Sequence, residues 1–567
     1  MARIVTTGEQ SFQTLRRNNY FYIDKTKFIK DWWLGGDPVT LITRPRRFGK
    51  TLMLDTVNTF FSYEFAGRSD LFAGLEIWKD EQFRNLQGTL PVIFLSFGKI
   101  KNDTYEATVS RIKTTLASIY GLFTPFIDFN AIPAAEKNIF TSINDSMSDE
   151  QAQDSLHYLC KFLTIQHKVK PIILLDEYDA PLQEAWLNKY WDKLVSFMRS
   201  FFNATFKDNP WLGRGLITGI TRVAKESIFS DLNNLKVITT TTNRYTDCFG
   251  FTEQEVFVAM DEYGLTEKEK VKEWYDGFIF GKQKNIYNPW SIIGYLSEKE
   301  FAAYWAHTSS NGLVGKLLAH GDERLKKDVE NLLDGKSIIT NIDDQIVFSN
   351  LDYDNEAIWS LLLASGYVKA ISFNAMSDVY EITLTNLESK IIMEKQILNW
   401  FKKVNNSRKN FQEALLADNL KYMNKFMSDI SKNIFSFFDT SGNEPERFYH
   451  AFVLGIIVDL KNRYEIRSNR ESGFGRYDVT MFPEQSNDHG IVIEFKTLEN
   501  DTEKNLQDTC KNALKQIKEK KYISELVSRG IGTSNIYVYG FSFKGKEVLI
   551  CGGLERNLDW SSILDTK

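Results

Sequence analysis

The stretch Pro38–Thr51, PVTLITRPRRFGKT, decides the fold of the N-terminal half of this chain. Residues 38–43 form a short apolar run rich in β-branched side chains. After the basic turn 44–49, the apolar positions of LMLDTVNTFFSYEF (52–65) recur at helical spacing. The order strand, loop, helix is typical of a phosphate-binding turn, where backbone N–H groups, a helix N-terminus and a lysine converge on one anion.

Three more apolar runs follow this turn along the chain. They are PVIFLSF (91–97), PIILLDEYDA (171–180) and GLITGIT (215–221), and helical patterns lie between them. Near-continuous apolar runs are typical of strands that are buried on both faces of a parallel sheet. The first half is therefore predicted to be a βαβ series, with an α/β sheet covered by helices on both faces.

The end of the turn carries the residues that phosphate chemistry needs. Gly49 would let the backbone approach a phosphate closely, Lys50 would contact the phosphates, and Thr51 would bind Mg²⁺ through its hydroxyl. The start of the turn departs from GxxxxGK(S/T), because Arg44 stands at the first glycine and Pro45 lacks an N–H. Positive charge in the loop is expected to compensate. The predicted nucleotide contacts of the loop are Arg46, Arg47, Phe48, Gly49, Lys50 and Thr51.

Two carboxylates follow the apolar run 171–175. Asp176 is placed to hold the Mg²⁺ of Thr51, and Glu177 is placed to polarise a water molecule. An Asp-Glu pair at a strand end is also a common turn or capping signal. Its place after the strand–loop–helix pattern favours the catalytic interpretation. Near the end of the next strand, Thr218 could sense the γ-phosphate and Arg222 could stabilise charge, although capping and surface charge explain these residues equally well.

The second half of the chain has a different pattern. From 296 to 440 it is mostly helical, as in IWSLLLASGYV (358–368), followed by a small hairpin pattern that suggests a winged-helix-like region. The turn-rich stretch 439–446 precedes a second α/β pattern. The predicted domains are therefore 1–295, 296–440 and 441–567.

Two strand patterns of the last domain carry a second candidate metal site. Because side chains alternate along a strand, Glu494 and Lys496 share one face of IVIEFKT (491–497). An antiparallel pairing with RYDVTMF (476–482) would bring Asp478 beside them. Asp478 and Glu494 could hold Mg²⁺, and Lys496 could orient the attacking water for phosphodiester hydrolysis. The alternative is a solvated polar face of an amphipathic sheet.

Several segments together resemble a known family. In order, these are TLRRNNYFYIDKTKFI, RPRRFGKT, ILLDEYDAP, LITGITRVAKESIFSDLNNLKV, WYDGFIFG, IYNPWS, IWSLLLASGYV and SNRESGFGRYDVTMF with IVIEFK. They are similar to AAA-ATPase-like proteins with a C-terminal PD-(D/E)xK nuclease-superfamily domain. In that family RPRRFGK is the usual form of the loop.

The resemblance implies the fold and the remaining site residues. It implies an additional-strand P-loop ATPase, a winged-helix-like region and a restriction-endonuclease-like α/β domain, with ATP and Mg²⁺ as cofactors. It implies that Gln516 is the polar residue of the downstream helix, with Tyr522 six positions later. Glu444 or Glu446 would add an upstream carboxylate, and the choice between them stays open.

Composition bounds the remaining expectations. At 567 residues the chain is too long for one core, and its net charge of −5 demands no anionic partner, so a nucleic-acid surface must be local. Arg470, Arg476 and the lysine-rich stretch 504–521 could form one.

Neither a signal peptide nor an apolar run long enough for a membrane is present. The four cysteines are scattered without a CxxC pair, which favours neither zinc nor a disulfide framework and fits a reducing cytoplasm.

The leading hypothesis is an ATP-binding and ATP-hydrolysing protein coupled to a Mg²⁺-dependent nuclease, with DNA expected rather than RNA and a homo-oligomer left open. One alternative is an ATP-driven regulatory switch whose nuclease-like domain binds nucleic acid without cutting it. Another is a non-enzymatic nucleic-acid-binding protein that uses the winged-helix-like region.

Overall fold

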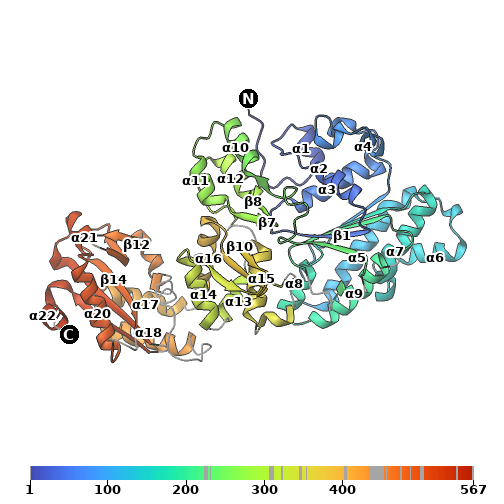
Figure 1. Cartoon of the computed structure of the whole chain (residues 1–567). Helices are drawn as coiled ribbons and strands as arrows, with labels where there is room; N and C mark the ends of the chain where they lie inside the picture. The colour runs from blue at the N-terminus through green and yellow to red at the C-terminus, as the bar shows by residue number, and fades with distance from the viewer. Residues whose placement is uncertain are drawn as a thin grey trace. The chain divides into compact units, whose positions relative to one another are not determined.

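The structure is a computed structural model that forms two compact units, which we describe separately. Unit 1 comprises residues 1–309 and 337–391, and unit 2 comprises residues 310–336 and 392–567 (Figure 1). The predicted domain ranges stay predictions. The structure describes residues 2–207, 209–222, 228–229, 232–305, 312–320, 323–343, 348–352, 354–400, 405–434, 453–454, 456–472, 475–485, 487–498, 503–544 and 547–564.

A five-stranded parallel sheet forms the centre of unit 1. Its order is β2-β3-β4-β1-β5, so β4 lies between β1 and β3. The candidate phosphate loop follows β1, and the Asp-Glu pair lies at the end of β3. All four predicted strands are present, and the structure adds β5, which the sequence analysis did not identify. The strands are β1 (Val39–Thr43), β2 (Val92–Ser96), β3 (Ile172–Asp176), β4 (Arg214–Gly219) and β5 (Leu235–Ile238).

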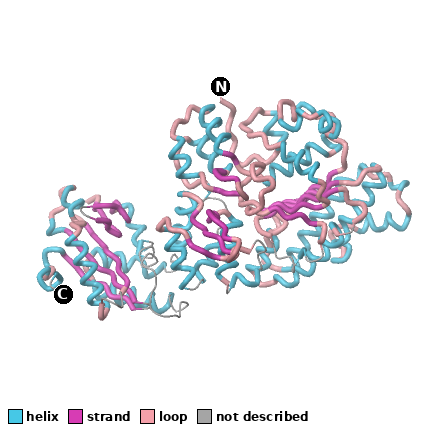
Figure 2. Tube along the Cα trace, viewed as in Figure 1, coloured by secondary structure: helices cyan, strands magenta, loops and turns pink. Residues whose placement is uncertain are grey.

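Helices cover both faces of this sheet, as predicted (Figures 1 and 2). On one face, Leu174 and Leu216 share a core with Phe28 of α2 and Val57 of α3. On the other face, α9 approaches β4 so closely that a Cβ at Gly215 would lie 2.9 Å from the Phe206 ring. The α-helices of this part of unit 1 are α1 (Phe12–Arg17), α2 (Lys27–Gly35), α3 (Lys50–Phe61), α4 (Glu81–Leu86), α5 (Tyr105–Phe123), α6 (Ala134–Ser142), α7 (Asp149–His167), α8 (Ala180–Leu187) and α9 (Trp191–Phe206).

Two small antiparallel sheets follow in unit 1. The first, ordered β6-β8-β7, contains β6 (Phe251–Thr252), β7 (Phe278–Phe280) and β8 (Gln283–Tyr287) and is accompanied by α10 (Glu253–Glu262), α11 (Lys268–Tyr275) and α12 (Pro289–Glu298). The second, ordered β10-β11-β9, contains β9 (Ile338–Thr340), β10 (Val368–Asn374) and β11 (Val379–Leu384). Helix α15 (Asn355–Ser365) leads into the β10–β11 hairpin, which agrees with the predicted helix and hairpin.

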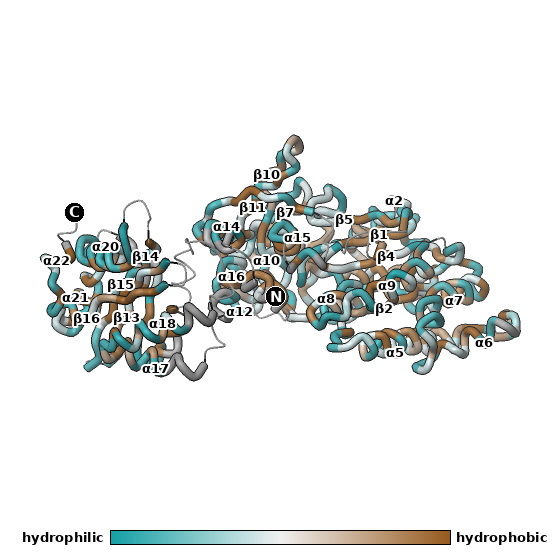
Figure 3. The backbone as a smooth tube through the Cα atoms, turned by 90° about the horizontal axis from the view of Figure 1, so that it is seen from below, coloured by the Kyte–Doolittle hydropathy of each residue, from teal (hydrophilic) through white to brown (hydrophobic). Residues whose placement is uncertain are grey.

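Unit 2 contains a mixed sheet of order β12-β13-β14-β15-β16. Only β14 and β15 are parallel, because α20 connects them as a crossover. Apolar residues concentrate on these strands (Figure 3). The strands are β12 (Tyr464–Ser472), β13 (Gly475–Pro483), β14 (Gly490–Thr497), β15 (Ile536–Lys544) and β16 (Glu547–Leu554).

The helices of unit 2 include α20 (Leu506–Glu519), whose buried residues Thr509, Cys510, Ala513, Leu514 and Ile517 form one stripe. The others are α13 (Gly312–His320), α14 (Glu323–Leu333), α17 (Asn405–Leu416), α18 (Leu420–Ile434), α21 (Ser524–Ser528) and α22 (Trp560–Leu564), and α16 (Leu387–Trp400) begins in unit 1. No helix in the described part of the chain is both long and apolar enough to cross a membrane.

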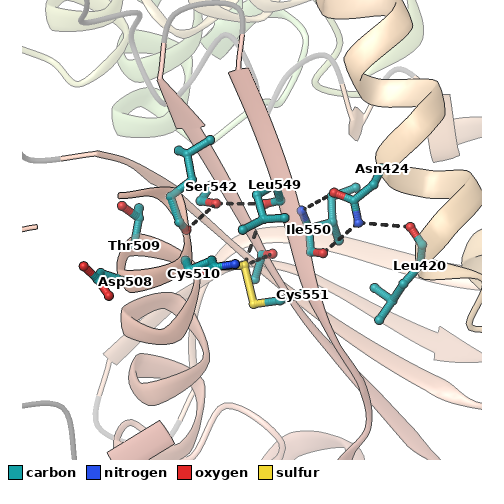
Figure 4. The surroundings of a disulfide bond; sticks show 12 residues. Leu420, Asn424, Asp508, Thr509, Cys510, Ser542, Leu549, Ile550 and Cys551 are labelled. Carbon is teal, nitrogen blue, oxygen red and sulfur yellow. Dashed lines mark hydrogen bonds between the residues drawn. A yellow bond between two sulfur atoms is a disulfide. The ribbon is translucent and has the colours of Figure 1, made fainter. Parts of the chain in front are cut away.

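The cysteines require a correction. Their spacing favoured no disulfide, but Cys510 of α20 is bonded to Cys551 of β16 (Figure 4). The two residues are 41 positions apart, and only the packing of α20 on the sheet brings their Cα atoms to 6.2 Å. Cys160 and Cys248 are free and buried.

Candidate functional site

The basic turn between β1 and α3 has a tightly wound backbone. Arg47 and Gly49 both have positive φ values, of 68° and 75°, and Gly49 is the N-cap of α3. A glycine adopts a positive φ without steric cost. At Arg47 the same backbone conformation is strained, because this residue carries a Cβ. Such a turn at the start of a helix is typical of loops that bind anions through backbone N–H groups.

Arg44, which stands at the position of the missing first glycine, is fully buried. Its guanidinium donates to the carbonyl oxygens of Thr43 and Thr239 at 2.9 and 2.7 Å and to that of Tyr245 at 3.3 Å. It also lies 4.6 Å from the centre of the Phe280 ring. Burial lowers the pKa of Arg44 to about 10, so the side chain is charged at neutral pH. The first position of the loop is thus fixed by a side chain.

Restoring the usual glycine is therefore expected to be harmful. Arg44→Gly should lower the free energy of unfolding by about 3 kcal/mol or more, because buried carbonyl oxygens lose a charged donor. It should also weaken ATP binding at least tenfold, measured by calorimetry beside denaturant unfolding. Arg68→Gly, which removes an arginine from the exposed pair with Asp70, is the matched control and should change little. Tighter ATP binding by Arg44→Gly would contradict this prediction.

Lys50 points into the loop. Its Nζ donates to the carbonyl oxygens of Arg44 and Pro45 at 2.9 and 2.8 Å. Burial lowers the pKa of Lys50 to about 8, although the nearby charges of Glu177 and Asp176 oppose this shift. The ammonium is therefore mostly protonated at pH 7, and two loop carbonyl oxygens mark the place that phosphate oxygens could take.

This pKa predicts how ATP affinity depends on pH. Because Lys50 loses its proton as the pH rises through about 8, affinity should fall about tenfold between pH 7 and pH 9. Lys50→Arg, whose guanidinium stays charged, should show no such fall relative to its own affinity at pH 7. Calorimetric titration at several pH values measures both. An equal fall in the two proteins would contradict the assignment to Lys50.

Asp176 joins the ends of three elements. Its two carboxylate oxygens accept hydrogen bonds from the Thr51 hydroxyl of α3 at 2.7 Å and from the Thr218 hydroxyl of β4 at 2.6 Å. The carboxylate is 2% exposed. A hydroxyl and a carboxylate in contact at the start of a helix are a suitable pair of oxygen donors for Mg²⁺. The two hydroxyl contacts connect the phosphate loop with the neighbouring strand.

Glu177 is held in an unusual backbone conformation, with φ of 51°. Burial, reinforced by the charge of Asp176 and opposed by that of Lys50, raises the pKa of the Glu177 carboxyl. Gly98 leaves room for it, because a Cβ at Gly98 would lie 2.5 Å from Glu177 Oε2. The sequence analysis did not single out Gly98, although a glycine just after a strand end is a signal of close approach.

The remaining predicted loop residues lie in different surroundings. Arg46 donates to Gln183 Oε1 at 3.1 Å, and the Arg47 guanidinium lies 4.1 Å from the centre of the Trp290 ring. Phe48 is buried against Phe278 and Phe280, with ring centres 4.8 and 5.4 Å apart. Its side chain therefore packs between the loop and β7. Among the described residues, Arg222 and Thr218 do not line the cavity beside the loop.

That cavity has a volume of about 350 Å³ and is lined by two groups of residues. One group is the phosphate loop with Glu177. The other comes from the N-terminal segment and the start of α12, where the Trp290 indole donates to the Tyr304 carbonyl at 3.3 Å. This size and mixed lining suit a nucleotide. The second group contains Thr6, Gly8, Gln10, Phe21, Tyr22, Ile23, Pro289, Trp290 and Ile293.

Asp179 is a further residue that the sequence analysis missed. Its Oδ2 accepts from the backbone N–H groups of Ile220 and Thr221 at 3.0 and 2.9 Å and from the Thr221 hydroxyl at 2.8 Å. Gln183, the partner of Arg46, donates to the same oxygen at 3.1 Å. Asp179 therefore fixes the end of β4 relative to the phosphate loop. Its place in DEYD was visible, but its partner 42 residues away was not.

The second candidate site lies on the sheet of unit 2. The predicted antiparallel pairing of β13 with β14 is present, with Val479 opposite Ile493. Asp478 directly precedes Val479 on β13. Glu494 and Lys496 lie on one face of β14, Glu494 buried and Lys496 partly buried. The register therefore places the three predicted residues on adjacent strands.

Helix α20 supplies the polar partner of Glu494. The Gln516 amide donates to Glu494 Oε1, and it also contacts the Tyr522 hydroxyl at 3.1 Å. Both residues implied by the family resemblance thus lie next to the site. A buried carboxylate with an amide neighbour is a donor set that suits Mg²⁺. Among the described side chains no three His, Cys, Asp or Glu form a cluster.

Some predicted residues cannot be placed. The side chains of Asp478, Arg470 and Arg476, and all of Glu444 and Glu446, lie outside the described residues. Of the lysines on α20, Lys518 pairs with Glu555 at 2.7 Å and Lys515 with Glu519 at 4.0 Å.

Comparisons with known families identify two domains in the chain. Residues 6–229 match the family model described as a predicted AAA-ATPase, and residues 444–552 match that of the PD-(D/E)XK nuclease superfamily. The chain therefore contains a predicted AAA-ATPase domain and a C-terminal PD-(D/E)XK nuclease-superfamily domain. It is also similar to an uncharacterized protein in the vnfD 5′ region of Azotobacter chroococcum mcd 1, with 22% identity over 565 residues, which cover 97% of this chain and 98% of that protein.

The matched ranges contain most of the predicted residues. The AAA-ATPase-like range includes the phosphate loop, Asp176, Glu177 and Thr218 but ends before Trp290. The PD-(D/E)XK range includes Asp478, Glu494 and Gln516, together with both cysteines of the disulfide.

Proposed function

We propose that the AAA-ATPase-like part binds ATP with Mg²⁺ and hydrolyses it. The observation that carries this proposal is Asp176, which accepts from both Thr51 and Thr218 beside the cavity that Lys50 enters. When bound, Mg²⁺ neutralises charge on the β- and γ-phosphate oxygens. Thr51 and Asp176 would hold it.

The other residues of the loop have separate roles. Lys50 would exchange the carbonyl oxygens of Arg44 and Pro45 for phosphate oxygens. Glu177, whose raised pKa makes it a better proton acceptor than an exposed glutamate, would orient the attacking water and take its proton. Thr218 would respond to any movement of Asp176 when the γ-phosphate leaves.

The part of the cavity lined by Gly8 and Trp290 would hold the nucleoside. Trp290 is fixed by its bond to the Tyr304 carbonyl, and Gly8 lies against its ring, because a Cβ at Gly8 would be 3.8 Å from it. This apolar wall supports ATP, which carries a base, rather than free phosphate as the ligand.

We also propose that the PD-(D/E)XK domain cleaves phosphodiester bonds of nucleic acid. Glu494 and Asp478 would hold Mg²⁺, which supplies a hydroxide nucleophile and stabilises the charge of the transition state. Lys496 would orient the water, and the lysines of α20 and residues Arg470 and Arg476 would contact the phosphate backbone. We expect DNA rather than RNA as the substrate, a cytoplasmic location, and nucleotide control of cleavage.

Two activity assays on the purified full chain, together with light scattering and calorimetry, test these proposals. The first measures ATP turnover with and without Mg²⁺. The second incubates single- and double-stranded DNA and RNA with the protein, with and without Mg²⁺ and ATP, and light scattering records the oligomer size. Intact nucleic acid together with an ATP-dependent change of oligomer size would favour the regulatory switch. No affinity for ATP in calorimetry would contradict the ATPase proposal.

A further inference from the structure

We propose that the Cys510–Cys551 disulfide is a redox-sensitive clamp that positions α20 over the nuclease site. The clamp would hold Gln516 against Glu494 in the oxidised state and release it in the reduced state. The consequence for metal binding rests on the proposed nuclease function, whereas the clamp itself rests on the packing of α20.

The disulfide and Glu494 belong to one row of the sheet. Glu494 of β14 pairs with Gly540 of β15, and Gly540 pairs with Cys551 of β16. Residues paired across neighbouring strands share a face, so Glu494, Gly540 and Cys551 all face α20. Gly540 lets the helix approach, because a Cβ there would lie 2.8 Å from the Cys510 carbonyl oxygen.

Helix α20 is held at both ends of this row. Cys510 is bonded to Cys551 at one end, and Gln516 donates to Glu494 at the other. Gln516 lies six positions after Cys510, which is about 9 Å along a helix. A shift of the helix at Cys510 would therefore be transmitted to the amide that contacts the site carboxylate.

The strand side of the disulfide is fixed independently. Asn424 of α18 accepts from the Ile550 N–H and donates to the Ile550 carbonyl, both at 2.8 Å, directly beside Cys551 (Figure 4). Because β16 keeps this support when the disulfide opens, the element that loosens is α20.

The surroundings accommodate both redox states. The Cys510 sulfur lies 3.1 Å from the Gly540 carbonyl oxygen and 3.7 Å from that of Leu549, so a thiol could donate to either. Cys551 is partly exposed on the edge strand, whereas Cys510 is buried. A dithiol reductant would attack the sulfur of Cys551, giving two cysteine thiols and its own disulfide in a balanced exchange of two electrons and two protons.

The test compares the full chain before and after treatment with dithiothreitol and anaerobic desalting. Two quantities are measured without nucleotide: the hydrogen exchange of residues 511–519 in α20, and the affinity for Mn²⁺. We expect exchange to become at least fivefold faster and Mn²⁺ affinity at least threefold weaker on reduction. Cys551→Ala should match the reduced protein and show no response to dithiothreitol, which excludes effects of Cys160 and Cys248.

Unchanged exchange in α20 after reduction would overturn the clamp. A response of Cys551→Ala to dithiothreitol would do the same. Faster exchange without a change in Mn²⁺ affinity would overturn the link to Glu494. If neither state binds Mn²⁺ while α20 still responds, the clamp stands and the proposed nuclease site is contradicted. Circular dichroism of Cys551→Ala verifies that the variant is folded.

Discussion

Glu494→Gln is expected to reduce nucleic-acid cleavage by about a thousandfold, because it removes an anionic oxygen from the proposed metal site. The change is nearly isosteric, and a buried residue on a central strand of unit 2 tolerates it better than a truncation. Gln516 keeps a carbonyl oxygen to donate to. Cleavage of labelled double-stranded DNA under single-turnover conditions measures the loss, and Mn²⁺ titration separates lost metal binding from lost chemistry.

The matched control is Glu465→Gln on β12 of the same sheet. Glu465 pairs with Arg467 and Arg529 on an exposed face, so its loss should change cleavage less than twofold. Lys496→Met should leave Mn²⁺ affinity nearly unchanged but lower the cleavage rate at least a hundredfold, because its proposed role concerns the water. Wild-type cleavage by Glu494→Gln would show that the carboxylate is structural and would favour the non-cutting alternative.

Lys50→Ala and Glu177→Gln are expected to separate ATP binding from hydrolysis. Lys50→Ala removes the only lysine whose Nζ lies on the loop carbonyl oxygens within the described structure, and ATP affinity should fall at least a hundredfold. Glu177→Gln keeps the side chain beside Gly98 but removes the proton acceptor. ATP affinity should therefore stay within threefold while turnover falls at least a hundredfold.

Calorimetry with ATP and a phosphate-release assay measure the two effects. Lys99→Ala, an exposed lysine next to Gly98, and Glu184→Gln, on the neighbouring helix α8, are the matched controls and should retain both activities. Normal turnover by Glu177→Gln would contradict its role as the base. Normal ATP affinity of Lys50→Ala would place the nucleotide elsewhere.

The fold of the parallel sheet could be predicted well because its signals are local. Each of the runs 38–43, 91–97, 171–175 and 215–221 is mostly apolar on both faces, and this pattern identifies a buried strand without knowledge of its neighbours. The missed strand β5, Leu235–Ile238, contains Lys236 and lies at the sheet edge, where exposure makes the apolar pattern weaker.

The candidate sites could be predicted only in part. GKT, DE and the ExK spacing each lie within a few residues, so the chemistry of the loop and of β14 was visible. Thr218 was also named from the sequence, and Gln516 through the family resemblance, but their contacts join distant segments. Thr218 lies 42 residues from Asp176, Gln516 lies 22 residues from Glu494, and Arg44 bonds to Thr239 across 195 residues.

By itself, the sequence determined which segments become strands and helices and which residue types stand at their ends, because backbone conformation and side-chain alternation depend on near neighbours. Only the tertiary structure decided that the Arg44 side chain anchors the start of the phosphate loop. It alone decided that the N-terminal segment and α12 line the cavity and that Cys510 reaches Cys551. These contacts depend on strand order and on how closely each helix packs on its sheet, which no local pattern encodes.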